Sequence, residues 1–141
     1  YYNGDFIALE KAHLNKGWKL VDNWHPDNKA GKRNGFVDVP MLEATRPGDR
    51  LTLDFRGKAI GIFCVSGPSA GILEYSVDGA PFKELDTFTE WSHNLYIPWV
   101  YMLETELKDT DHKLVLRISK KKNPASQGTE CQIRNFVVNG R

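Results

Sequence analysis

The chain has 141 residues, of which 40% are hydrophobic and 26% charged, a composition that favours one folded domain over a disordered chain. Its 19 basic and 18 acidic side chains nearly cancel, and a net charge of +1 excludes the broad basic field that non-specific nucleic-acid binding requires. The longest apolar run, residues 59–65, is much shorter than the roughly 20 residues that span a membrane. We therefore expect a single domain over residues 1–141, with no nucleic-acid and no membrane partner.

The beginning of the chain carries neither an initiator methionine nor the pattern of a signal peptide. We therefore expect the domain to be excised from a larger modular protein.

Short strand-like runs separated by turn signals dominate the sequence. Leu51, Leu53 and Phe55 alternate with polar residues, and the nearly all-apolar run 59–66 is typical of a strand buried on both faces. Residues 101–107 could form one or two helical turns at most. The predicted strands, in chain order, are residues 18–21, 35–39, 50–56, 59–66, 73–77, 81–85, 112–119 and 131–138. Roughly nine strands with this spacing predict an all-β fold, a β-sandwich.

The dipeptide Asp78-Gly79 lies between the runs 73–77 and 81–85 and is a two-residue hairpin signal. A type I′ turn needs positive φ at both central residues, which glycine adopts without strain. We expect the chain to reverse here.

The two cysteines, Cys64 and Cys131, both fall in strand-like segments, where a lone cysteine usually behaves as a small buried hydrophobe. A disulfide requires the two strands to face each other at a suitable distance, so a Cys64–Cys131 bridge and two free thiols both stay open. No CxxC motif or closely spaced Cys/His set supports a zinc site.

Candidate catalytic groups are few. Glu104 with Glu106, and Glu84 with Asp86, could flank a glycosidic bond, but charged residues two apart on a strand usually form a solvated face. No serine stands in a Gly-Asp-Ser or Gly-x-Ser-x-Gly context. The histidines are scattered without metal-ligand spacing, at His13, His25, His93 and His112. The sequence therefore predicts no catalytic residue.

Aromatic and polar residues concentrate between positions 89 and 101. Sugar rings stack an apolar face on an indole, and their hydroxyl groups need hydrogen-bond partners at the rim. The competing interpretation is that tryptophans fill the core, as Trp18 or Trp99 could. Pro98 favours an edge strand or a loop for its segment. We predict a carbohydrate-binding surface formed by Trp91, Trp99, Tyr96, His93 and Glu90, with Trp24 next in line.

Several stretches together resemble one family. They are residues 67–83 (GPSAGILEYSVDGAPFK), 89–92 (TEWS), 97–99 (IPW) and 116–119 (LRIS). They look like the β-sandwich accessory domain attached to SGNH (GDSL-type) carbohydrate esterases of polysaccharide-degrading bacteria. The resemblance covers most of the chain, from about residue 18 to residue 139.

This resemblance implies a jelly-roll sandwich, with the esterase triad in a separate domain. Asp22 and His25 look like the acid–base end of that triad, but the Gly-Asp-Ser block and the oxyanion donors are missing, so we interpret the pair as a polar turn. A structural calcium is common in jelly-roll sugar binders. Glu10, Asp38 or Asp22 could supply its oxygen ligands, although no clustered acidic loop demands one.

We expect a non-catalytic carbohydrate-binding module that targets an attached esterase to plant cell-wall polysaccharide. Its partners are then a polysaccharide or oligosaccharide and the adjacent catalytic domain. Its place is outside the cytoplasm, secreted, periplasmic or on the surface of a polysaccharide-degrading bacterium. The alternative is a structural accessory domain that supports the adjacent SGNH esterase domain without binding sugar itself.

Overall fold

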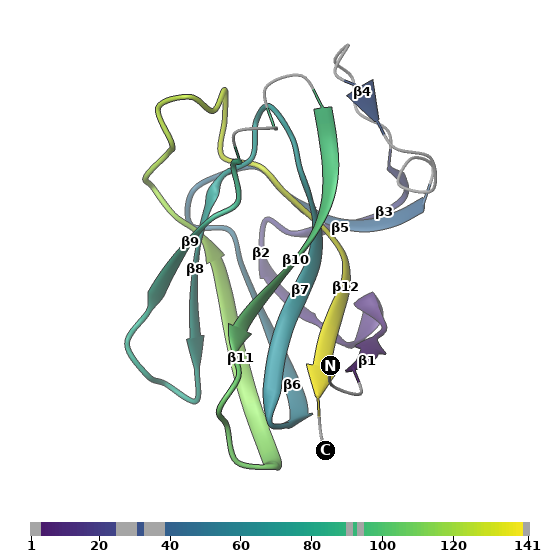
Figure 1. The fold of residues 1–141 in the computed structure, drawn as a ribbon, viewed down its shortest axis with the longest axis vertical. Coiled ribbons are helices and arrows are strands. Elements are labelled where there is room, and N and C mark those ends of the chain that lie inside the picture. The colour runs from purple at the N-terminus through teal and green to yellow at the C-terminus, as the bar shows by residue number, and fades with distance from the viewer. Residues whose placement is uncertain (1–3, 25–30, 33–38, 90–91, 93–94, 140–141) are drawn as a thin grey trace.

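A computed structural model describes residues 4–24, 31–32, 39–89, 92 and 95–139 (Figure 1). These residues form strands joined by turns and loops, together with the short 3-10 turn η1 (Leu9–Lys11). The strands are β1 (Gly4–Ile7), β2 (His13–Lys16), β3 (Lys19–Trp24), β4 (Gly31–Lys32), β5 (Val39–Ala44), β6 (Arg50–Gly57), β7 (Ala59–Ser66), β8 (Ile72–Val77), β9 (Lys83–Asp86), β10 (Leu95–Glu104), β11 (Thr110–Ile118) and β12 (Cys131–Asn139). Within the described part of the chain, no helix is long and apolar enough to cross a membrane.

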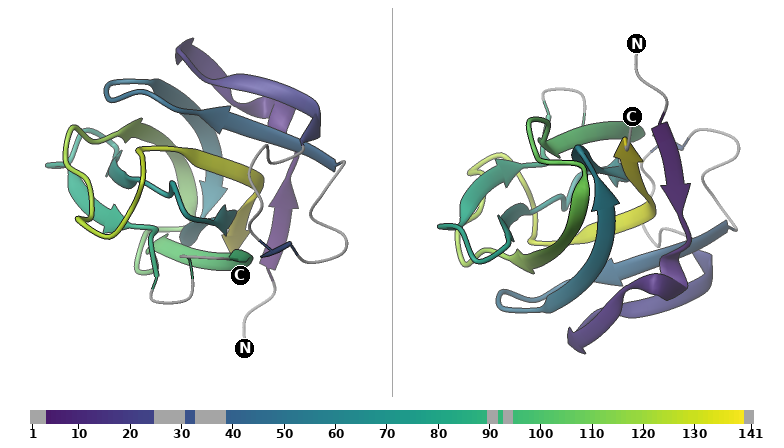
Figure 2. Two further views of the ribbon diagram at one scale, coloured as in Figure 1. Left: turned by 90° about the horizontal axis from the view of Figure 1, so that it is seen from above. Right: turned by 90° about the horizontal axis from the view of Figure 1, so that it is seen from below.

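The strands form two sheets that face each other (Figure 2). One has the order β3-β5-β12-β7-β10-β4, with β1 paired to β12, and the other has the order β2-β6-β11-β8-β9. From β5 to β12 the chain passes back and forth between the sheets, and this connectivity over eight strands is that of a jelly roll. The predicted β-sandwich is confirmed. Gly4 and Asn139 are register partners, so both ends of the described chain lie at the same edge of the molecule.

The core lies between the two sheets and follows the predicted alternation. Leu51 and Leu53 of β6 are fully buried, and Leu114 and Leu116 of β11 are fully buried opposite them. Removing this apolar surface from water is the main favourable contribution to folding. Almost every residue of β7 is buried, as expected for a central strand covered on both faces.

β10 is a strand that the sequence pattern does not predict. It continues through Glu104, into the stretch 101–107 that could form one or two helical turns at most, because Tyr101 and Met102 pair with the central strand β7. On the side away from β7, the described part of β10 pairs with the short β4, at Leu95 and Tyr96. Pro98 therefore lies where β10 is a free edge, as its missing N–H requires.

The N-terminal part also contains strands that the sequence pattern does not reveal. β1 and β2 have no clear alternation of apolar and polar residues, and β2 is exposed throughout. The strand predicted over residues 35–39 falls mostly outside the described residues, since β5 begins at Val39.

The β8–β9 hairpin confirms the turn predicted at Asp78-Gly79. The φ angles are +56° at Asp78 and +77° at Gly79, and the N–H of Ala80 donates to the carbonyl of Val77. Two positive φ angles in a two-residue turn are the mark of type I′.

Gly79→Val should lower the free energy of unfolding by about 1–3 kcal/mol, since a β-branched residue is strained at positive φ. No atom lies within 4 Å of the position that a Cβ at Gly79 would take, so the loss comes from the backbone alone. Gly79→Asn is the matched control, because asparagine tolerates this conformation and should cost much less. Chemical denaturation of both variants measures the difference, and equal losses would contradict the assigned turn.

Candidate functional site

The predicted sugar-binding surface is only partly described by the structure. Trp91, His93 and Glu90 lie outside the described residues, and so does the side chain of Trp24, whose backbone belongs to β3. Their role stays a prediction. Trp99 and Tyr96 are the two predicted residues whose side chains are placed.

Tyr96 corrects the prediction. Its side chain is only 5% exposed and packs with Met41 and Val65 in a second apolar cluster. The ring also covers Gly67 so closely that a Cβ there would lie 2.3 Å from it. Sequence reasoning placed Tyr96 on the surface because its neighbours are polar, but a buried ring has no free face for a sugar.

Trp99 is 41% exposed, in contrast to the 4% of Trp18, which belongs to the core. It lies on β10, and the centroid of its ring is 6.4 Å from that of Tyr101, two residues along the same strand. Residues two apart on a strand share a face, so the two rings form a continuous aromatic surface. Burial raises the pKa of Tyr101 and keeps its phenol protonated.

Charged groups lie further along β10, where it approaches the edge strand β9 of the other sheet. Lys83 of β9 and Glu104 of β10 form an ion pair of 2.7 Å across this edge. The negative charge of Glu104 also acts on the phenol of Tyr75, whose pKa is raised by burial and, to a lesser degree, by Glu104. An aromatic surface with a rim of donors and acceptors is the chemistry that a saccharide needs.

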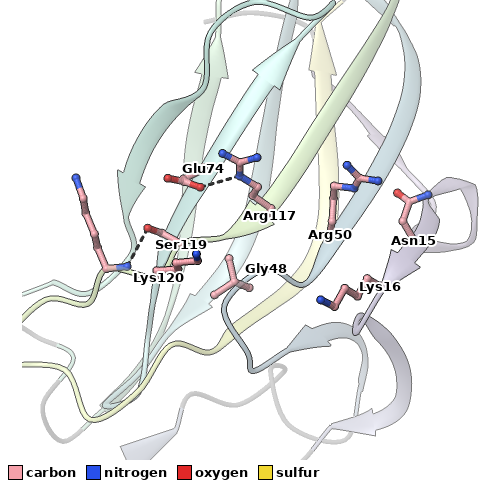
Figure 3. A pocket seen from close by; sticks show the side chains of 10 residues that line it. Asn15, Lys16, Gly48, Arg50, Glu74, Arg117, Ser119 and Lys120 are labelled. Atoms are coloured by element: carbon pink, nitrogen blue, oxygen red, sulfur yellow. Dashed lines mark hydrogen bonds and ion pairs between the residues drawn. The ribbon is translucent and has the colours of Figure 1, made fainter.

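The outer face of the other sheet carries a cleft of about 830 Å³ (Figure 3). Its lining consists of Asn15, Lys16, Gly48, Arg50, Glu74, Arg117, Ile118, Ser119, Lys120 and Lys121. Five of these side chains are cationic and one is anionic. Sequence reasoning missed this cleft, because its residues come from four separate segments of the chain.

Sequence reasoning also missed a histidine–aspartate pair. The Nδ1 atom of His112 lies 2.5 Å from the carboxylate of Asp78, and Nε2 lies 2.7 Å from the carbonyl of Lys108. A carbonyl only accepts hydrogen bonds, so Nε2 carries a proton and donates it to Lys108. The nitrogen that would have to activate a nucleophile is thus occupied. The pair resembles part of a catalytic triad but anchors the β8–β9 turn instead.

The described residues contain no group of three or more His, Cys, Asp or Glu side chains that could hold a metal ion. Glu10 and Asp22, two of the calcium ligands that the sequence suggests, are exposed, and Asp38 lies outside the described residues.

The two cysteines are free and buried, which decides between the two alternatives left open by the sequence. Burial raises the pKa of Cys64 to about 12 and raises that of Cys131 as well, so both thiols stay protonated. Neither thiol is poised for metal binding or nucleophilic chemistry.

Comparison with known proteins supports the fold. No protein-family model matches the sequence, and no curated protein matches it either. Solved structures do resemble it. A two-domain esterase (CEX) active on acetylated mannans, co-crystallised with mannopentaose, aligns with a TM-score of 0.60 at 15% identity, over 94% of this chain and 37% of the esterase. A family two carbohydrate esterase from Cellvibrio japonicus aligns with a TM-score of 0.57 at 11% identity, over 100% of this chain and 35% of that chain.

A third match has the same extent as this domain. The CBM36-1 domain of a multidomain xylanase from the hindgut metagenome of Trinervitermes trinervoides aligns over 99% of this chain and 98% of its own, with a TM-score of 0.54 at 8% identity. At such identities the likeness concerns the fold. The chain spans only about a third of the esterases that it matches.

The His112–Asp78 pair makes stability depend on pH. The hydrogen bonds to Asp78 and to the Lys108 carbonyl raise the pKa of His112. Protonated His112 therefore stabilises the folded protein fully below the ordinary pKa of about 6.5, and this stabilisation is lost as the pH rises through the raised pKa. The hydrogen bond from His112 lowers the pKa of Asp78, whose contribution is complete above about pH 4 and is lost as the pH falls through the lowered pKa.

Asp78→Asn should therefore lower the free energy of unfolding more at pH 5.5 than at pH 9, and should lower the pKa of His112 measured by NMR. Asparagine tolerates the positive φ of this turn position, so the backbone is kept. Asp54→Asn, at an exposed carboxylate on β6, is the control. An equal loss of unfolding free energy at pH 5.5 and pH 9, together with an unchanged pKa of His112, would show that His112 and Asp78 do not interact as an ion pair.

Proposed function

We propose that this domain is a non-catalytic carbohydrate-binding module that targets an attached polysaccharide-degrading esterase to plant cell-wall polysaccharide. The likeness to a CBM36 domain over almost the full length of both chains supports a binding role. The likeness to about a third of two carbohydrate esterases supports an adjacent catalytic domain. A module that acts on cell-wall polysaccharide works outside the cytoplasm, so secretion or attachment to the cell surface is part of the proposal.

The observation that carries the proposal is the indole of Trp99, 41% exposed on an edge strand beside the ring of Tyr101. Leaving a large aromatic in water brings no folding benefit, whereas stacking on a pyranose ring buries it on binding. The Lys83–Glu104 pair, whose Glu104 lies five residues beyond Trp99 on the same strand, provides donors and acceptors for sugar hydroxyl groups of a longer chain.

The alternative, a structural accessory domain, also has an observation in its favour. The outer face of the β3-β5-β12-β7-β10 sheet exposes Phe6 by 64% and Val100 by 45%, and the ring of Phe6 stacks on that of Phe63 at 6.4 Å. Val100 is the register partner of Phe63, so these side chains form one apolar patch. Such a patch is typical of a surface that another protein domain covers.

Trp99→Ala should weaken binding to a recognised polysaccharide about thirtyfold, because truncating an aromatic anchor costs roughly 2 kcal/mol. Affinity electrophoresis with xylan, acetylated mannan and β-1,3-galactan measures the loss, because a variant that no longer binds the polysaccharide in the gel migrates as fast as it does in a gel without polysaccharide. Val100→Ala is the matched control, since Val100 is the next residue on β10, is similarly exposed and points to the opposite face. A domain that binds none of these polysaccharides would favour the structural alternative.

The domain should not hydrolyse aryl acetates above the buffer rate, because the sequence lacks the nucleophile block and the Nε2 atom of His112 is occupied. A chromogenic acetate assay checks this. Activity that His25→Ala abolishes would instead give Asp22 and His25 a catalytic role.

A further inference from the structure

One row of charged side chains crosses the entire five-stranded sheet on its outer face. Register pairing places Lys16 of β2 opposite Arg50 of β6, and Arg50 opposite Arg117 of β11. The row continues from Arg117 to Glu74 of β8 and from Glu74 to Glu84 of β9. Neighbouring strands lie about 4.8 Å apart, so three cations follow one another at that spacing before the first carboxylate.

The arrangement of like charges is specific to this row. On the same two strands, Lys113 lies opposite Asp54 and Asp111 lies opposite Arg56, so those cross-strand pairs have opposite signs. Arg117 opposite Arg50 breaks the pattern. Like charges directly opposite each other destabilise a sheet. The fold gives Arg117 a partner in Glu74 but gives the side chain of Arg50 none among the described residues, and an anion bound between the two arginines would offset their repulsion.

Four members of the row, Lys16, Arg50, Arg117 and Glu74, line the cleft in Figure 3, and part of the row's charge is unpaired. Nε of Arg117 donates to Glu74 at 2.7 Å, and Lys121 pairs with Glu84 at 3.0 Å. Among the described residues, Lys16, Arg50 and Lys120 have no ion-pair or hydrogen-bond partner. The cleft thus presents three free cations on a protein whose net charge is only +1.

Arg117 is held in place for a ligand. Its guanidinium carbon lies 3.6 Å above the centre of the Phe82 ring, and Glu74 fixes Nε from the side. A guanidinium held in this way loses less freedom when its remaining N–H groups bind a planar anion such as a carboxylate.

The lining also contains groups that can hydrogen-bond sugar hydroxyls. Asn15 lies beside Lys16 at one end of the row, and Glu74 adds a carboxylate acceptor at the other end. In the part of the chain that the structure describes, the lining contains no aromatic side chain on which a nucleotide base could stack, since Phe82 lies outside it.

We infer that this cleft is a second binding site, which takes a saccharide bearing carboxylate groups, such as a uronic-acid segment of an acidic polysaccharide. Arg50 and Arg117 bind the carboxylate, Lys16 and Lys120 supply further positive charge, and Asn15 and Glu74 bind hydroxyl groups. The choice of a saccharide among anions rests on the proposed function, whereas the anion site itself rests on the charges and the cleft.

The test is isothermal titration of the 141-residue protein with trigalacturonate and with its neutral methyl ester, at low and high salt. The acid should bind at least tenfold more tightly than the ester, and raising the salt should weaken it. Arg50→Gln should reduce acid binding at least tenfold without lowering the thermal midpoint, because it removes a like-charge pair. If Arg50→Gln does not fold, Lys120→Gln on the exposed loop replaces it, and this variant should also bind trigalacturonate more weakly than the unmodified protein.

Arg56→Gln is the matched control. Arg56 lies on the same strand and the same face as Arg50, but it pairs with Asp111 and lies outside the cleft. Acid binding should be unchanged in this variant. An equal loss of acid binding in Arg50→Gln and Arg56→Gln would overturn the site, because the loss would then follow from the lower net charge of the protein and not from the cleft.

Three further arms identify the ligand and separate this inference from the proposed function. Tighter binding of inorganic sulfate or of polyuridylate RNA than of trigalacturonate would overturn the saccharide assignment. Equal binding of the acid and its methyl ester would overturn the role of the cations. Retention of trigalacturonate binding in Trp99→Ala would support a site separate from the aromatic edge, and its loss there would overturn that separation.

Discussion

The two sheets are held together by aliphatic side chains that point inward from their central strands, and this burial fixes the register of every strand around them. Leu51 and Leu53 meet Leu114 and Leu116 within one sheet, and Ile62 and Ile133 cover them from the other. Because side chains alternate along a strand, a slip of one residue would turn this whole set to solvent. The same register therefore decides which polar residues share the outer face.

The cationic row is a consequence of that constraint. Once Leu51 and Leu116 are buried as partners, Arg50 and Arg117 lie opposite each other on the outer face, and neither strand can shift to separate them. The core supplies far more stabilisation than one like-charge pair removes, so the fold can keep charges together that would repel each other on a less constrained surface. Binding sites are where such local conflicts are expected.

The two candidate surfaces suit different parts of one kind of ligand. Trp99 and Tyr101 offer ring faces on the open edge of the sandwich, and the cleft at Arg50 and Arg117 offers positive charge on a sheet face. The apolar patch around Phe6 and Phe63 lies on the opposite sheet from the cleft, so an adjacent domain docked there would leave the cleft open.

The sequence by itself determined the elements whose signals are local. Strict alternation in β6, the apolar run of β7 and the Asp78-Gly79 turn each depend on a few adjacent residues, and each is confirmed. The β-sandwich followed from the spacing of such runs. β10 did not follow from the sequence, because Pro98 and its polar and aromatic neighbours obscure a strand that pairing with β7 stabilises.

Only the tertiary structure decided which distant residues meet. Tyr96 has a polar neighbourhood in sequence and a buried one in space. His112 and Asp78 are 34 residues apart, and Arg117 and Glu74 are 43 apart, so no local pattern reveals either pair. The net charge of +1 is an average that hides a cationic cleft. Sheet register gathers charges according to which strands lie side by side, and that order depends on how the whole chain packs its core.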